Sequence, residues 1–159
     1  MSDEQKIAID VRQAPARASR SKFPPEFAAR MDKRVKHPLG DLFGLSVFGV
    51  NFTKILPGGI SAVRHAHSVN DEFIYVVEGE PTLVTDAGET KMKPGMCAGF
   101  KAGTNDAHHL VNKTDKDVFY LEIGDRQPGD DVLYPDDDLA VKKEPGGKRS
   151  FFHKDGTPY

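Results

Sequence analysis

The sequence predicts a single all-β domain, and two observations lead to that prediction. From Leu42 onward, short runs rich in Val, Ile, Phe and Thr follow one another, as is typical of β-strands. Glycine and proline interrupt these runs every few residues, for example at Pro57-Gly58-Gly59 and Lys93-Pro94-Gly95. Many short strands with frequent turns favour a sandwich or a barrel over a parallel sheet.

The first 40 residues precede this pattern and are predicted to form an extended N-terminal arm. They contain more Lys and Arg than Asp and Glu, together with several prolines. A short helix is expected from Pro24 to Met31, because proline is tolerated in the first turn of a helix. We expect the rest of the arm to lie along the barrel or along a partner subunit. The arm is too short for a helix-turn-helix domain.

The barrel itself is expected within residues 41–124. Asp86-Ala87-Gly88-Glu89 is predicted to be a hairpin turn, with a glycine that can adopt a positive φ. The predicted strands lie near residues 44–56, 60–67, 72–78, 81–86, 89–93, 96–100, 107–112 and 117–123.

After Gly124 the pattern becomes irregular, and residues 125–159 are predicted to be a C-terminal extension that packs on the barrel and ends in a tail. Short strands near 139–141 and 150–152 are expected to close over the barrel. The acidic groups 130–131 and 136–138 are interpreted as solvated loops, because carboxylates are common on loops.

Composition excludes several classes of partner. The net charge of -2 gives no overall attraction to nucleic acid or to an anionic membrane, so neither is expected as a partner. The single cysteine, Cys97, excludes an internal disulfide and is interpreted as a small buried core residue. The sequence contains no apolar signal segment and no stretch long enough to span a bilayer, so we expect a soluble, cytoplasmic protein.

The most informative group of residues is His65-Ala66-His67. On a strand, side chains two residues apart point to the same face, so both imidazoles can converge on one ion. Glu72 opens the next predicted strand, and an antiparallel return would bring it beside the two histidines. Two imidazoles and one carboxylate suit a divalent transition metal such as Zn, Fe, Mn or Ni.

A fourth ligand is expected from the strand that contains His108 and His109. Adjacent residues on a strand point to opposite faces, so only one of the two can share the inner face with the other ligands. The alternation alone leaves that choice open.

The strand after Glu72 has apolar residues on both faces. If Glu72 points inward, Ile74 and Val76 also point inward, and Phe73, Tyr75 and Val77 point outward. An apolar outer face suggests that another element or subunit covers it, and we therefore expect a homodimer.

These residues resemble the two motifs of the cupin superfamily. The first motif matches at every fixed position, and the second matches with two departures. Lys101 replaces the usual proline, and the loop at residues 104–107 is two residues longer than the common form. The matching residues are Gly59, His65, His67, Glu72 and Gly79 in the first motif, and Gly95, Gly103, His108 and Asn112 in the second.

The resemblance implies a double-stranded β-helix, that is, a jelly-roll cupin barrel, with a divalent metal inside it. By the motif spacing, His65, His67, Glu72 and His108 would hold this metal. Water or a small-molecule substrate would occupy the remaining coordination positions. His109 would then be a surface residue or a neighbour of the ligands. No catalytic residue and no cofactor other than the metal is identified.

The fold does not determine the function, so we consider three interpretations of the function. The resemblance to small bacterial cupins grouped with phosphomannose-isomerase-like proteins favours an isomerase or epimerase of a sugar phosphate. Lys54, Lys101 and His109 are candidate phosphate-binding or basic groups, although each is also explained as surface charge. The alternatives are a ferrous-iron dioxygenase and a small-molecule binding or sensing module without turnover. A basic pocket around the metal would favour the phosphorylated substrate, and an apolar or aromatic pocket with iron would favour oxygen chemistry.

Overall fold

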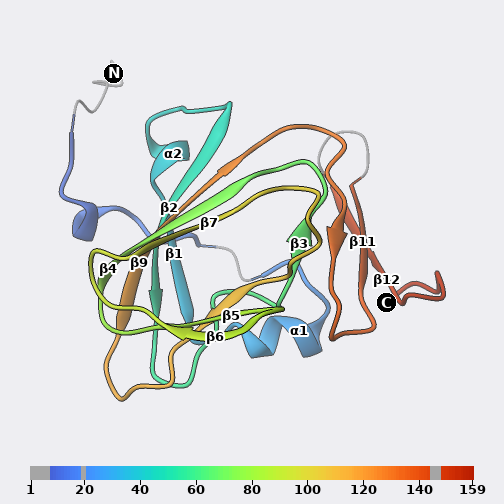
Figure 1. The fold of residues 1–159 in the computed structure, drawn as a ribbon. Coiled ribbons are helices and arrows are strands. Elements are labelled where there is room, and N and C mark those ends of the chain that lie inside the picture. The colour runs from blue at the N-terminus through green and yellow to red at the C-terminus, as the bar shows by residue number, and fades with distance from the viewer. Residues whose placement is uncertain (1–7, 19–20, 144–147) are drawn as a thin grey trace.

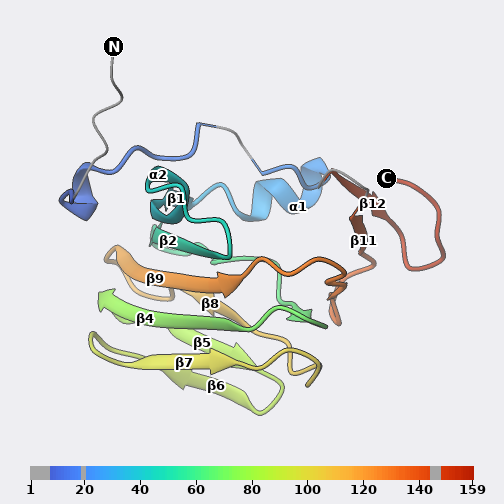
Figure 2. The same cartoon turned by 90° about the horizontal axis from the view of Figure 1, so that it is seen from above.

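Two antiparallel β-sheets face each other in the computed structural model, which describes residues 8–18, 21–143 and 148–159 (Figures 1 and 2). The larger sheet has the order β1-β2-β9-β4-β7, and the smaller sheet has the order β6-β5-β8. The strands of the larger sheet are β1 (Arg34–Pro38), β2 (Phe48–Ile55), β9 (Val118–Asp125), β4 (Glu72–Glu78) and β7 (Cys97–Phe100). Those of the smaller sheet are β6 (Gly88–Lys91), β5 (Thr82–Thr85) and β8 (His109–Val111). The predicted all-β jelly roll is confirmed.

The hydrophobic core lies between the two sheets. Ile74 and Val76 of β4 are 4% and 0% exposed, so the predicted inward face of this strand is confirmed. They belong to one buried cluster with Leu83 of β5 and Leu110 of β8. Burial of these side chains is the main favourable contribution to pairing the sheets.

The outer face of β4 is exposed, as predicted. Phe73, Tyr75 and Val77 are 39%, 41% and 37% exposed. Cys97 is also exposed, so the prediction that it is a buried core residue is wrong. The reason is the sheet register, which places Cys97 directly opposite Tyr75 and therefore on the outer face.

The predicted strand 60–67 is mostly irregular. Only β3 (Ala66–His67) is a strand, and it pairs with β10 (Val132–Leu133). The side chain of Ser61 explains part of this irregularity. Its hydroxyl accepts a hydrogen bond from the Leu110 amide at 2.8 Å, so this amide is not used in a backbone–backbone hydrogen bond of a regular β-ladder.

The N-terminal arm contributes a strand that the sequence did not predict. The helix α1 (Pro25–Arg30) begins with a proline, as expected, and is preceded by a short 3-10 helix at Val11–Gln13. β1 then pairs with β2 along its whole length. A second short helix, α2 (Leu39–Leu42), leads into β2.

The C-terminal extension packs against α1 and covers one end of the barrel (Figure 2). Its strands β11 (Ala140–Lys143) and β12 (Arg149–Phe152) form an antiparallel pair close to the positions predicted. Tyr134 and Leu139 from this extension share a second buried cluster with Phe27 and Met31 from the arm. No helix among the described residues is both long and apolar enough to cross a membrane.

Candidate metal centre

Three histidines surround the carboxylate of Glu72 on the inner side of the barrel. Glu72 Oε2 lies 2.9 Å from His108 Nε2 and 3.4 Å from His65 Nε2. Glu72 Oε1 lies 3.6 Å from His67 Nε2. The structure therefore brings together all four residues that the sequence singled out, although binding of a metal by them stays a prediction.

Backbone pairing explains why His108 and not His109 joins this cluster. The amide of His108 donates to the carbonyl of His65 at 2.8 Å, and the amide of His65 donates to the carbonyl of His108 at 3.2 Å. Residues directly opposite each other in an antiparallel pair place their side chains on the same face. His109 faces the other way, and its Nδ1 lies 3.0 Å from the carbonyl oxygen of Ala62.

Neighbouring groups orient the imidazole rings. His65 Nδ1 lies 2.8 Å from the carbonyl oxygen of Val63. Because a carbonyl only accepts hydrogen bonds, Nδ1 of His65 carries a proton, and this bond turns Nε2 toward Glu72. The ring of His108 stacks on Phe100, with centroids 3.4 Å apart and planes 1° from parallel.

Asp130 holds the third histidine, and this residue was assigned wrongly from sequence. It was interpreted as part of a solvated acidic loop, but it is only 3% exposed. Its Oδ2 accepts a hydrogen bond from Nδ1 of His67 at 2.7 Å, and its Oδ1 accepts from the amides of Val69 and Asn70. Burial would raise the pKa of Asp130, but the bonds from His67 and the two amides lower it to about 2. Its position 63 residues from His67 in the chain left no local pattern from which to predict the contact.

Two members of the cluster, Glu72 and His108, have pKa shifts that favour the charge state in which they can bind a cation. Burial alone would raise the pKa of Glu72, but hydrogen bonds from His108, His65 and His67 lower it far below its ordinary value, so Glu72 is an anion at neutral pH. Burial also lowers the pKa of His108, despite the opposing effect of Glu72, which favours the neutral imidazole that binds metals.

The donor set fits a divalent transition metal. The candidate ligand atoms of His65, His67 and Glu72 lie within 4.8 Å of one another, and His108 touches the same carboxylate. Imidazole nitrogens with one carboxylate suit Zn, Fe, Mn and Ni and do not select among them. Asp130 completes a carboxylate–histidine pair of the kind that orients metal ligands in proteins.

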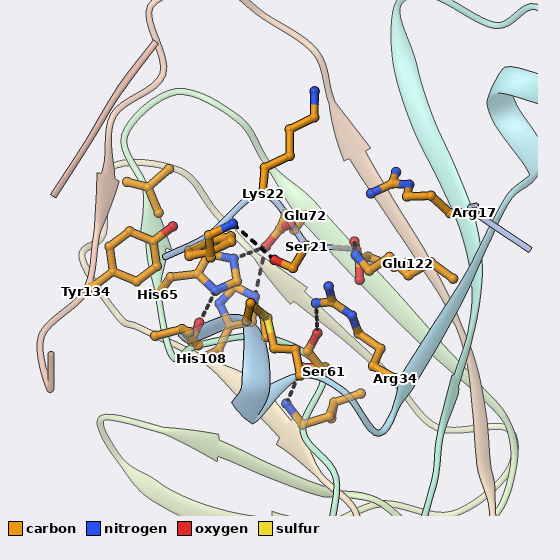
Figure 3. Close-up of a pocket in the computed structure, with 18 of the residues that line it drawn as sticks. Arg17, Ser21, Lys22, Arg34, Ser61, His65, Glu72, His108, Glu122 and Tyr134 are labelled. Carbon is orange, nitrogen blue, oxygen red and sulfur yellow. Dashed lines mark hydrogen bonds and ion pairs between the residues drawn. The ribbon is translucent and has the colours of Figure 1, made fainter. Parts of the chain in front are cut away.

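The four residues line one wall of a cavity of about 880 Å³ (Figure 3). On the neighbouring strands of the larger sheet, Lys36 Nζ lies 2.7 Å from Glu122 Oε1, and the hydroxyl of Tyr120 donates to Glu122 Oε2 at 3.2 Å. Aromatic side chains of Phe100, Tyr134 and Phe151 also line the cavity. Its positively charged lining residues are Arg17, Lys22, Arg34, Lys36 and Arg149.

The basic candidates from sequence do not line this cavity. Lys54 forms an ion pair with Asp117 at 2.7 Å, and His109 bonds to the carbonyl of Ala62. Lys101 is exposed and lies outside the cavity lining. Arg34 and Lys36 were missed because the arm was not predicted to contain a strand. The alternation Arg34-Val35-Lys36-His37 would have placed Arg34 and Lys36 on one face of such a strand.

Comparisons with known proteins agree with this fold. The model of the cupin domain family matches residues 51–124. The crystal structure of a sugar phosphate isomerase of the cupin superfamily from Silicibacter pomeroyi is 41% identical, has a TM-score of 0.88, and aligns over 96% of both chains. No curated protein matches the chain significantly.

Two further solved structures are more distant. One is named as a candidate sugar phosphate isomerase from Acidithiobacillus ferrooxidans; it is 26% identical, with a TM-score of 0.71, over 86% of this chain and 94% of that one. The polyketide cyclase RemF from Streptomyces resistomycificus is 20% identical, with a TM-score of 0.62, over 77% of this chain and 82% of that one. The second similarity shows a common fold alone.

Proposed function

The chain belongs to the cupin superfamily, and from that membership we propose that it is a metal-dependent enzyme that isomerises or epimerises a phosphorylated sugar. One observation carries the choice of substrate. The side chains of Arg17, Lys22 and Arg149 line the same cavity as the histidine cluster and make no ion pair with any residue that the structure describes. Unpaired cations beside a metal site favour an anionic substrate.

In this proposal His65, His67, Glu72 and His108 hold a divalent transition metal. When bound, such an ion polarises a carbonyl oxygen and thereby acidifies the neighbouring C–H group. Asp130 fixes the ring of His67 and favours its metal-binding tautomer. The aromatic ring of Phe100 keeps the ring of His108 in one orientation.

Glu122 is our candidate for moving the proton between the two carbon atoms. It faces Ile74 in the pairing of β4 and β9, so it lies one diagonal step from Glu72 on the inner face of the sheet. Burial alone would raise the pKa of Glu122, but the ammonium group of Lys36 lowers it, so Glu122 is a carboxylate, the form that can accept a proton, at neutral pH.

The proposal agrees with what the similar structures are named. A relative that is 41% identical over 96% of both chains is named a sugar phosphate isomerase. An apolar or aromatic pocket was expected for the ferrous-iron dioxygenase considered from sequence. The cavity does contain aromatic side chains, and its five Lys and Arg residues are the feature that supports the phosphorylated substrate instead.

The test uses the full chain purified without a histidine tag and without added metal. Its metal content is measured by elemental analysis. The same protein is then incubated in D₂O with a panel of aldose and ketose phosphates and with the unphosphorylated sugars, and NMR follows deuterium incorporation and isomer formation. We expect about one metal ion per chain and turnover of a phosphorylated sugar alone.

The Glu122→Gln variant should retain the metal and lose deuterium incorporation. Stoichiometric iron with substrate-dependent oxygen consumption would instead establish the dioxygenase. Bound metal with neither turnover nor oxygen uptake would leave a binding or sensing protein and end the enzymatic proposal.

A further inference from the structure

Two guanidinium groups lie together at one end of the cavity. Arg34 comes from β1, and Arg17 comes from the N-terminal arm that runs beside it. In Figure 3 both lie on the side of His65 that faces away from Tyr134, with Glu122 close by.

Backbone contacts hold the arm in this position. The amide of Arg17 donates to the carbonyl of Lys36 at 2.8 Å, which fixes Arg17 beside β1. Three residues earlier, the carbonyl of Ala14 lies 2.7 Å from Nδ1 of His37, and Ala14 is buried. The position of Arg17 at the cavity therefore follows from ordered contacts on β1.

The charges of these two groups are only partly balanced. Glu122, the carboxylate on this wall, is already bonded to Lys36 and to the hydroxyl of Tyr120. Arg34 donates one of its N–H groups to the carbonyl of Ser61, and Arg17 has no ion pair within the described residues. Burial, together with the nearby charge of Arg17, lowers the pKa of Arg34, although Tyr120 and Glu122 oppose this effect. Two like charges held close together are stabilised when an anion lies between them.

We propose that Arg17 and Arg34 form a phosphoryl-binding subsite, which holds the phosphate monoester of the substrate at the end of the cavity beneath the N-terminal arm. The planar guanidinium group presents parallel N–H donors that match two phosphate oxygens at once. A phosphate monoester carries nearly two negative charges at neutral pH, which two arginines can balance. The subsite rests on the proposed function for its substrate and assigns the residues that recognise its anionic end.

This subsite gives the substrate a direction in the cavity. The phosphoryl group would lie against β1 and the arm, while the carbons that react would lie toward Glu72 and the histidines. The cavity volume of about 880 Å³ is within the range of small-molecule sites, which accommodates both contacts in one pocket. A phosphoryl-binding subsite would also give a function to the arm residues that precede the barrel and line its cavity.

The test measures binding of inorganic phosphate by calorimetry to the full chain after treatment with a chelator, so that phosphate cannot bind through a metal. Arg17→Gln, Arg34→Gln and the double variant are compared with the unchanged protein. The matched control is Arg12→Gln, because Arg12 lies in the same arm but is paired with Glu78 and does not line the cavity. We expect each cavity variant to weaken phosphate binding about tenfold or more, since it removes a charge-assisted hydrogen bond. The control should bind as the unchanged protein does.

Folding is checked by thermal unfolding of every variant. Arg17 is exposed, so Arg17→Gln is expected to fold normally even if Arg34→Gln, which loses a bond to Ser61, does not. Arg34→Lys keeps the charge and should restore part of the affinity. Unchanged phosphate affinity in Arg17→Gln would overturn the assignment. Loss of phosphate binding only in Lys22→Gln or Arg149→Gln would also overturn it. The same holds if acetate competes for the protein's binding site as well as phosphate does.

Failure of the subsite and failure of the enzymatic proposal are separable. If the arginine variants lose phosphate binding but no sugar phosphate is turned over, the subsite stands and the isomerase activity is rejected. If turnover is found and the variants bind phosphate normally, the activity stands and the subsite is rejected. Metal content, measured in each variant before the chelator treatment, should be equal in all of these variants.

Discussion

Nδ1 of His67 donates a hydrogen bond to Oδ2 of Asp130 at 2.7 Å, and this contact joins the candidate metal centre to the C-terminal extension. The same carboxylate accepts hydrogen bonds from the amides of Val69 and Asn70, so it also fixes the turn between β3 and β4. One buried side chain thus orients a candidate ligand and the loop that leads to Glu72. The extension beyond the barrel is part of the site for this reason.

Asp130→Asn should weaken metal binding without abolishing it. The amide would keep the shape of the side chain but remove the charge that favours the metal-binding tautomer of His67. Loss of such an outer partner typically reduces metal affinity by about 10–100-fold. Competition with a chromophoric chelator measures the affinity, and Asp131→Asn is the control, because Asp131 is exposed. Equal affinities of the two variants would contradict this role of Asp130.

His108→Ala should remove most of the bound metal, whereas His109→Ala should retain it. Of these two histidines, His108 has its Nε2 at the carboxylate of Glu72, while His109 is turned toward the carbonyl of Ala62. Deleting one of four donors removes a direct metal bond. Elemental analysis of both variants, purified in parallel, checks the prediction. The reverse result would mean that the strand binds the metal in a different register.

Gly79→Ala should destabilise the protein by about 2–5 kcal/mol, because it combines backbone strain with overpacking. Gly79 has a φ of 81°, and an added Cβ would lie 2.5 Å from the backbone oxygen of Asp117. Gly88 is the matched control: its φ is 119°, but a Cβ there would meet nothing within 4 Å. Urea denaturation should therefore show a much smaller loss for Gly88→Ala. Similar losses in the two variants would show that contact with Asp117 has no effect.

Tyr75→Glu should convert a homodimer into a monomer. The outer face of β4 exposes Phe73, Tyr75 and Val77, and the positions paired with Tyr75 are the uncharged residues Cys97 and Leu121. Two copies of such a face can bury one another around a twofold axis, and a buried unpaired carboxylate opposes this strongly. Light scattering after size-exclusion chromatography measures the mass.

Leu133→Glu provides the control for this experiment, because Leu133 is 42% exposed but lies on β10, outside the larger sheet. It should leave the mass of the dimer unchanged. A monomeric unchanged protein at high concentration would refute the predicted dimer.

The inner and outer faces of the barrel strands could be predicted from the sequence, because successive side chains on a strand point to opposite faces. The alternation after Glu72 placed Ile74 and Val76 inside and Phe73 and Tyr75 outside, and the structure agrees. Spacing also brought His65 and His67 to one face. These are properties of neighbouring residues, and covalent geometry is sufficient to fix them.

Burial, in contrast, could not be read from residue type alone. Cys97 was expected inside because cysteines usually are buried, but the register of β7 against β4 puts it outside. Asp130 was expected in solvent because carboxylates usually are exposed, but His67 and two backbone amides satisfy it inside. A residue's exposure depends on partners that can be distant in the chain.

The sequence by itself determined the barrel, the motif residues and the face on which His65 and His67 lie. Only the tertiary structure decided that His65 pairs with His108, that Asp130 holds His67, and that the arm brings Arg17 and Arg34 into the cavity. The physical reason is the range of the interactions involved. Local alternation follows from the backbone of adjacent residues, whereas the site is assembled by contacts between segments that meet only when the chain is folded.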